Sequence, residues 1–98
     1  MLKAVDGGHF VVTGDLGYET VQSLLADGVA QFAGAGTEFE IDLAGVTQSD
    51  SAGLALLIEW LKVADRAGKR VRYTRVPAQL RALARISEIE GILPMAAG

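Results

Sequence analysis

The sequence predicts an α/β fold, a mixed β-sheet of four to five strands with its helices packed mainly on one side. Two kinds of segment alternate along the chain. In one kind, apolar and polar residues alternate as in a strand; in the other, apolar residues recur at helical spacing. The connections between these segments are short and rich in glycine, as expected for turns. With 98 residues, the chain is expected to form a single domain over 1–98.

The first half of the chain is predicted to form a β-hairpin followed by a helix. Residues 2–5 and 9–13 are the candidate strands, Asp6-Gly7-Gly8 is the candidate turn between them, and a turn cluster at 14–17 follows. A helix is expected near 19–33. Its apolar residues have the spacing of an amphipathic helix: Val21, Leu24, Leu25, Gly28, Val29 and Phe32.

The second half is predicted to alternate strand, helix, strand and helix. Residues 38–43 alternate apolar and polar side chains and should form a central strand. The helix expected over 51–67 ends at a glycine followed by Lys69, and both residue types favour a helix C-terminus. A strand over 71–76 follows, and a proline then suits the first turn of a last helix over 78–86.

The junction between the central strand and the helix over 51–67 is the most informative part of the chain. Asp50 and Ser51 stand where a helix needs side-chain acceptors for its unpaired N–H groups. Gly53 permits close backbone approach in the first turn, although glycine costs a helix about 1 kcal/mol relative to alanine. Two interpretations fit this pattern: a plain N-cap, or a helix start that serves as a contact surface.

This junction also carries a family resemblance. The stretch IDLAGVTQSDSAGL, residues 41–54, resembles the signature of STAS domains, the fold shared by anti-sigma-factor antagonists and the cytoplasmic tails of sulfate transporters. The longer stretches at 41–69 and 80–94 are similar to MlaB-type proteins, small STAS subunits of a bacterial ABC transporter that moves phospholipids and maintains outer-membrane lipid asymmetry. The resemblance implies a STAS-like fold and a non-catalytic subunit that binds and supports the cytoplasmic ATPase of the transporter.

The same resemblance implies an alternative function, a phosphorylation-controlled switch. In anti-sigma-factor antagonists, the serine that matches Ser51 is phosphorylated by the partner kinase, which releases the complex. A phosphate at a helix N-terminus is tolerated by the helix dipole. The modification would therefore disrupt the contact with the partner rather than unfold the domain. Ala52 replaces the second serine typical of that branch, which favours the MlaB-type interpretation.

The helix over 51–67 has more apolar surface than its core contact requires. One arc is predicted to face the core: Gly53, Leu56, Leu57, Trp60, Leu61, Ala64 and Ala67. Ala55 and Ile58 fall beside Ser51 on the solvent side of the helix wheel, where isolated apolar residues are also common. The predicted partner-binding surface comprises Asp50, Ser51, Ala52, Gly53, Leu54, Ala55 and Ile58.

Composition excludes several classes of function. The net charge of −3 argues against general nucleic-acid binding, and zero cysteines exclude disulfides and thiolate zinc sites. The longest apolar run is far below the roughly 18–20 residues that span a bilayer, and no signal-peptide pattern opens the chain. We therefore expect a cytoplasmic protein that meets the membrane only through the transporter complex.

No catalytic constellation is visible, so we expect neither enzyme activity nor a cofactor or metal. His9, the one histidine, has no second histidine or carboxylate in a metal-binding pattern and is expected to be structural. Trp60 is expected in the core, with its indole N–H bonded to a carbonyl or to water.

The charges are unevenly distributed along the sequence. Residues 1–60 hold nine acidic side chains against Lys3 alone, whereas residues 61–98 hold eight basic side chains against three acidic ones. This asymmetry predicts an acidic face and a basic face that would orient a protein partner. The alternative is an ordinary solvated surface.

Overall fold

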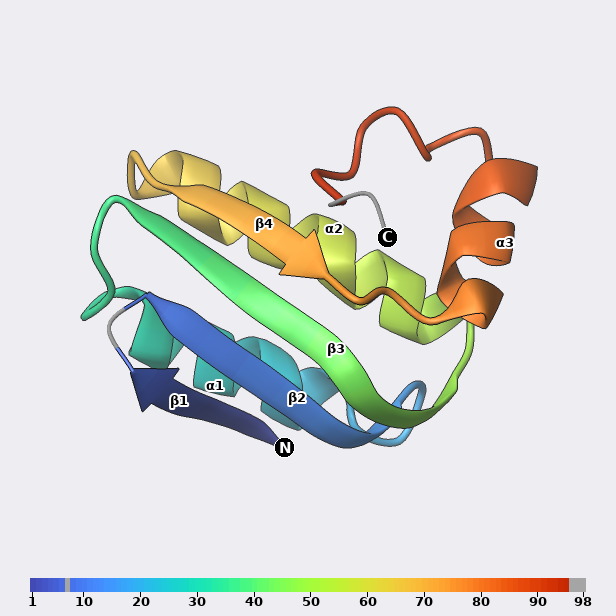
Figure 1. Ribbon diagram of the computed structural model, residues 1–98, viewed down its shortest axis with the longest axis horizontal. Helices are drawn as coiled ribbons and strands as arrows, with labels where there is room; N and C mark the ends of the chain where they lie inside the picture. Colours follow the sequence, from blue (N-terminus) through green and yellow to red (C-terminus); the bar gives the residue numbers. More distant parts are fainter. Residues whose placement is uncertain (7, 96–98) are drawn as a thin grey trace.

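A four-stranded mixed sheet organises the chain, as seen in the computed structural model, which describes residues 1–6 and 8–95 (Figure 1). The elements in chain order are β1 (Leu2–Asp6), β2 (His9–Leu16), α1 (Val21–Phe32), β3 (Glu38–Ser49), α2 (Ser51–Arg66), β4 (Arg70–Thr74) and α3 (Ala78–Ile86). The strand order is β1-β2-β3-β4; β1 is antiparallel to β2, and the other neighbours are parallel. The predicted α/β fold with its mixed sheet is confirmed.

The helices are concentrated on one face of the sheet, as predicted. Helices α1 and α2 lie behind the sheet in Figure 1, and α3 packs at one end, near the start of α2. The opposite face of the sheet, called the open face below, is turned toward the viewer. Within the described part of the chain, no helix is long and apolar enough to cross a membrane.

The core lies between the sheet and the two long helices. Alternate strand residues point into it and are buried: Phe10, Val12, Leu16, Phe39, Ile41, Leu43, Val71 and Tyr73. The indole of Trp60 donates a hydrogen bond to the carbonyl oxygen of Leu24 at 3.2 Å, which confirms the expectation for this residue. Gly28 makes room for the indole, because a Cβ there would overlap it. Val29, counted with the apolar stripe of α1, is 53% exposed instead.

Strands β2 and β3 extend several residues further than the sequence predicted. Their parallel pairing continues through two register irregularities as far as Leu16 and Ser49, so the expected turn at 14–17 is largely strand. Gly45 of β3 lies where β2 approaches closely, and it leaves room for the Thr13 side chain, which would lie 2.9 Å from a Cβ at this position. As a result, Asp50 alone separates β3 from α2.

The edges of the sheet differ from expectation in smaller ways. Strand β4 was predicted over 71–76 but ends at Thr74, because Arg75 adopts a left-handed backbone conformation with φ 51°. The predicted hairpin is confirmed by the antiparallel pairing of β1 with β2, in which Leu2 faces Val12. Its expected turn includes Gly7, which lies outside the described residues.

The C-terminal end of α1 is held by Lys69, which lies in the turn between α2 and β4. The Lys69 ammonium donates hydrogen bonds to the carbonyl oxygens of Phe32, Ala33 and Ala35. Carbonyls at a helix C-terminus lack partners within the helix, and a cation there also favours the helix dipole. Lys69 was predicted to favour the end of α2, whereas its ammonium group stabilises the end of α1.

Candidate interaction site at the start of helix α2

Asp50 caps α2 and ties a second loop to the helix start. Its backbone is extended, and its Oδ1 accepts hydrogen bonds from the backbone N–H groups of Ala52 and Gly53 at 2.8 and 3.1 Å. Its Oδ2 accepts a third from the N–H of Tyr18 at 3.1 Å. These bonds hold the pKa of the Asp50 carboxyl below its ordinary value, with the bond from Tyr18 as the largest cause, followed by that from Gly53. The N-cap interpretation therefore applies to Asp50.

Ser51, the next residue, keeps its hydroxyl uncommitted. It is the first residue of α2, it is exposed, and its side chain makes no hydrogen bond to the described residues. The hydroxyl therefore stands at a helix N-terminus, where the helix dipole favours negative charge. Its position suits either contact with a partner or modification.

Two glycines let the loop after β2 lie flat against the first turn of α2. A Cβ at Gly53 would overlap the carbonyl oxygen of Leu16, and one at Gly17 would lie 2.7 Å from the Asp50 carboxylate. The sequence predicted close backbone approach at Gly53 and left open whether this helix start is a plain N-cap or a contact surface. The structure assigns this contact to the chain itself, because the space over Gly53 is filled by β2.

The seven predicted contact residues divide into a surface group and a buried group. Asp50, Ser51 and Ala55 are exposed, and Ala52 and Ile58 are half-buried. Gly53 and Leu54 were predicted to be part of the partner surface, but both are buried within the domain and are not exposed to a partner. Leu54 is 5% exposed and belongs to the core, because this position in the first turn of α2 is covered by other parts of the chain rather than by solvent. Ile58 also packs against the core with part of its side chain.

Sequence reasoning missed Tyr18, which is displayed beside the same helix start. Its side chain is 82% exposed, and its backbone is held by Asp50. Tyr18 borders a hollow of about 350 Å³ whose other residues come from the ends of β2 and β3: Asp15, Gly17, Glu19, Gln48, Ser49 and Asp50. The sequence signal for this loop was a pair of glycines, Gly14 and Gly17, which predicted an ordinary turn.

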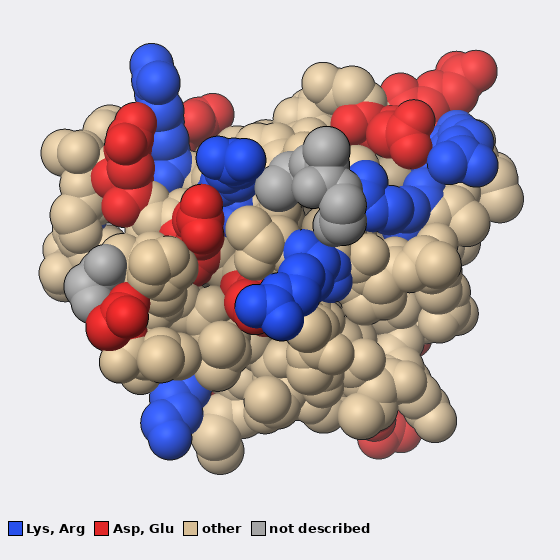
Figure 2. All heavy atoms as spheres, in the orientation of Figure 1, with Lys and Arg blue, Asp and Glu red and all other residues tan. Residues whose placement is uncertain are grey.

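The uneven charge distribution along the sequence does not produce separate acidic and basic faces. Figure 2 shows acidic and basic side chains interleaved over the open face. The acidic residues of β3 lie beside basic residues at β4 and form three ion pairs: Glu38 with Arg70 at 3.9 Å, Glu40 with Arg72 at 4.0 Å and Asp42 with Arg75 at 3.4 Å. The expectation of two faces was wrong because parallel pairing brings the two halves of the sequence side by side.

His9 has two acidic neighbours that were not predicted from the sequence. Its Nδ1 lies 2.7 Å from the Asp6 carboxylate, and its Nε2 lies 3.4 Å from that of Glu40. The hydrogen bond with Asp6 is the main cause that raises the pKa of the His9 imidazole above 6.5. Among the described residues, no group of His, Asp and Glu is arranged to hold a metal ion.

The fold has solved counterparts over the whole chain. A Thermotoga maritima protein provisionally assigned as an anti-sigma factor antagonist is 16% identical, with a TM-score of 0.78 over 100% of this chain and 86% of that chain. The anti-sigma factor antagonist SpoIIAA in its unphosphorylated form is 18% identical, with a TM-score of 0.69 over 100% and 87%. Identities this low establish a shared fold, and the chain is an α/β protein with the fold of these two structures.

The family of the chain is shown by its match to a protein-family model. A family model described as "Mlab, STAS domain" matches residues 3–94, nearly the whole chain, and the protein belongs to this family. A search of curated proteins returned no match.

Proposed function

We propose that this protein is a non-catalytic accessory subunit that binds and supports the ATPase of an ABC transporter for phospholipids, and so contributes to outer-membrane lipid asymmetry. The observation that carries the proposal is the match of residues 3–94 to the Mlab family model. In this role the chain would be cytoplasmic and would reach the inner membrane only through the transporter complex.

The start of α2 is the surface we assign to the ATPase. Ser51 and Ala55 are exposed there, Ala52 and Ile58 are half-buried, and Tyr18 stands beside them on a loop that Asp50 fixes. Because the first turn of α2 is pinned by side-chain and backbone contacts, little conformational entropy would be lost on binding. A small, rigid patch of mixed polarity fits a specific protein contact.

The experiment is a binding titration against the purified ATPase of the transporter from the same organism. We expect Ser51→Asp to weaken binding by about tenfold or more, because the partner would face an unpaired charge in its interface. Ser23→Asp, on the exposed side of α1, is the matched control and should bind like wild type. Equal affinities for wild type and Ser51→Asp would remove Ser51 from the interface, and no binding of the wild type would overturn the proposed function.

A second candidate function is an anti-sigma-factor antagonist that binds a serine kinase and is switched by phosphorylation of Ser51. It is favoured by the exposed, uncommitted hydroxyl of Ser51 and by the likeness in fold to SpoIIAA. Incubation with the purified kinase and ATP, followed by mass spectrometry, distinguishes the two functions. Phosphate on Ser51 that is absent from a Ser51→Ala variant would favour the switch, whereas an unmodified chain that binds the ATPase would favour the transporter subunit.

A further inference from the structure

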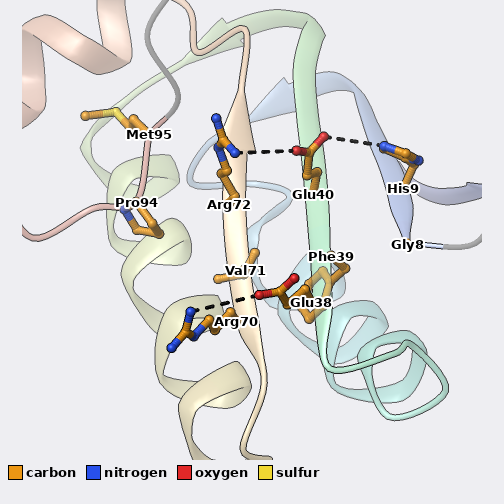
Figure 3. A pocket seen from close by; sticks show the side chains of 10 residues that line it. All are labelled: Gly8, His9, Glu38, Phe39, Glu40, Arg70, Val71, Arg72, Pro94 and Met95. Atoms are coloured by element: carbon orange, nitrogen blue, oxygen red, sulfur yellow. Dashed lines mark ion pairs between the residues drawn. The ribbon is translucent and has the colours of Figure 1, made fainter.

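The open face of the sheet carries a second hollow, far from the start of α2. It measures about 570 Å³ and lies where β3 and β4 begin, at the opposite end of β3 from Asp50 (Figure 3). Pro94 and Met95 border it beyond β4, and His9 borders it on the β2 side. The hollow is therefore open to solvent but has a wall on each side.

Four charged side chains between these walls form a regular array. Glu38 and Glu40 project from β3, and in the parallel register Glu38 faces Arg70 while Glu40 faces Arg72 on β4. Neighbouring strands lie about 4.8 Å apart, and residues i and i+2 of one strand lie about 6.6 Å apart. Like charges are thus aligned along each strand, and opposite charges face each other across the strands (Figure 3).

The arginine–glutamate ion pairs within this array are too loose to prevent binding of a ligand, and the Glu40 carboxylate also lies 3.4 Å from Nε2 of His9. The guanidinium–carboxylate distances are 3.9 Å for Arg70 with Glu38 and 4.0 Å for Arg72 with Glu40, too long for hydrogen bonds. Exposed pairs of this kind contribute little stability, so exchanging them for contacts with a ligand costs little. A guanidinium also has several N–H donors in a planar fork that matches the oxygens of a phosphate or carboxylate.

We propose that this hollow binds a small zwitterion, an aminoalkyl phosphate whose ammonium and phosphate groups are about 5 Å apart, the spacing of neighbouring strands. Laid across the sheet, its ammonium lies between Glu38 and Glu40, and its phosphate lies between Arg70 and Arg72. Each charge of the ligand then meets two opposite charges. An α-amino acid fits less well, because a single carbon separates its charged groups and cannot span the two strands.

The same chemical group exists as a free molecule and as a lipid headgroup, and the experiment separates these sources. The free probe is O-phosphoethanolamine, followed by NMR titration of the full chain. We expect saturable shifts confined to the backbone amides of residues 8–9, 38–40 and 70–72, with an affinity about tenfold higher than for inorganic phosphate or ethanolamine alone. Phosphate binding as tightly as the zwitterion, or no saturable shift, would overturn the proposal.

Vesicles of phosphatidylethanolamine, compared with vesicles of phosphatidylglycerol, test the headgroup as the source. Binding of the free probe without binding to vesicles would assign the site to a soluble molecule. Binding to both the probe and phosphatidylethanolamine vesicles, with loss of both in the arginine variant below, would assign it to a headgroup.

Two double variants test the residues. Arg70→Gln/Arg72→Gln should weaken binding of O-phosphoethanolamine by about tenfold or more, because both phosphate contacts lose their charge. Lys62→Gln/Arg66→Gln on α2 removes the same net charge away from the hollow and should bind like wild type. Unchanged affinity in the arginine variant would overturn the proposal. Should that variant not fold, Glu38→Gln/Glu40→Gln provides the same test from the ammonium side.

Discussion

Gly53 of α2 and Leu16 of β2 are in backbone contact, with the carbonyl oxygen of Leu16 occupying the space that any Cβ at position 53 would need. The contact joins the end of β2 to the first turn of α2, next to the hydrogen bond between Tyr18 and Asp50. The surface proposed for partner binding is therefore assembled from two parts of the chain that are more than thirty residues apart in sequence.

Gly53→Ala should destabilise the fold, although alanine is the better helix former. The obstructing atom belongs to the backbone of Leu16, so β2 or α2 must shift, and overpacking of this kind costs about 1–3 kcal/mol. Denaturant unfolding measures the change. Gly36→Ala is the control, because a Cβ there would have open space and the change should be close to neutral. An alanine at position 53 that stabilised the protein would contradict the contact.

The contribution of Asp50 to stability should depend on pH and be lost in acid. Its pKa is lowered in the folded state, so its contribution is present above the ordinary value of 3.8 and is lost as the pH falls through the folded-state pKa. Asp50→Ala should cost about 1–2 kcal/mol near neutral pH. Asp50→Asn should cost less, because an amide oxygen can still cap α2 while its NH₂ group cannot accept from Tyr18.

Melts of the two Asp50 variants and wild type at several pH values check this prediction. The advantage of wild type over Asp50→Asn should shrink below about pH 4 as the carboxyl becomes protonated. A difference between these two proteins that stayed constant down to the most acidic pH would show that the charge of Asp50 has no part in its contribution.

His9 should have the opposite pH dependence. Its pKa is raised in the folded state by Asp6 and Glu40, so its stabilising contribution is fully present below 6.5 and is lost as the pH rises through the folded-state pKa. Thermal melts of wild type and His9→Gln at about pH 5.5 and about pH 8.5 should show a wild-type advantage only at the lower pH. A larger advantage at the higher pH would contradict the assigned ion pairs.

Lys69→Met should loosen the end of α1. Three carbonyl oxygens lose a charged donor while the aliphatic part of the side chain is largely kept, and the loss should cost about 1–3 kcal/mol. Lys62→Met is the control, because among the described residues the ammonium of Lys62 contacts only the exposed Glu59 carboxylate. This change should alter stability by less than about 0.5 kcal/mol. Faster hydrogen exchange of the last turn of α1 should accompany the loss, and unchanged exchange there would contradict the capping role.

The sequence predicted the fold because its signals are local. Alternation in 38–43 and helical spacing in 51–67 depend on neighbours within a few residues, and both elements begin at the predicted residue. Strand ends were less predictable. Whether residues 14–16 form a turn or continue β2 depends on pairing with the end of β3, which is a long-range contact.

The candidate site was predictable only in part, for a related reason. The capping role of Asp50 follows from a local rule, whereas the burial of Leu54 depends on which parts of the chain pack over the first turn of α2. The contact of Tyr18 with Asp50 and the acidic neighbours of His9 depend on tertiary packing. One local signal was present but not used: Asp6 stands three residues before His9.

Substitutions at Ile58 test the proposed ATPase contact independently of Ser51. Ile58 is half-buried and packs partly against the core, so Ile58→Glu should lower the melting temperature moderately and also abolish binding by placing a charge in a dry contact. Ile58→Ala separates the two effects, because it removes the same packing without adding charge and should retain more binding. Arg66→Glu, at the far end of α2, is the control for charge and should change neither measurement much. Melts by circular dichroism and co-purification with the ATPase provide the measurements. A folded Ile58→Glu variant that bound the ATPase at wild-type strength would exclude this face of α2 from the interface.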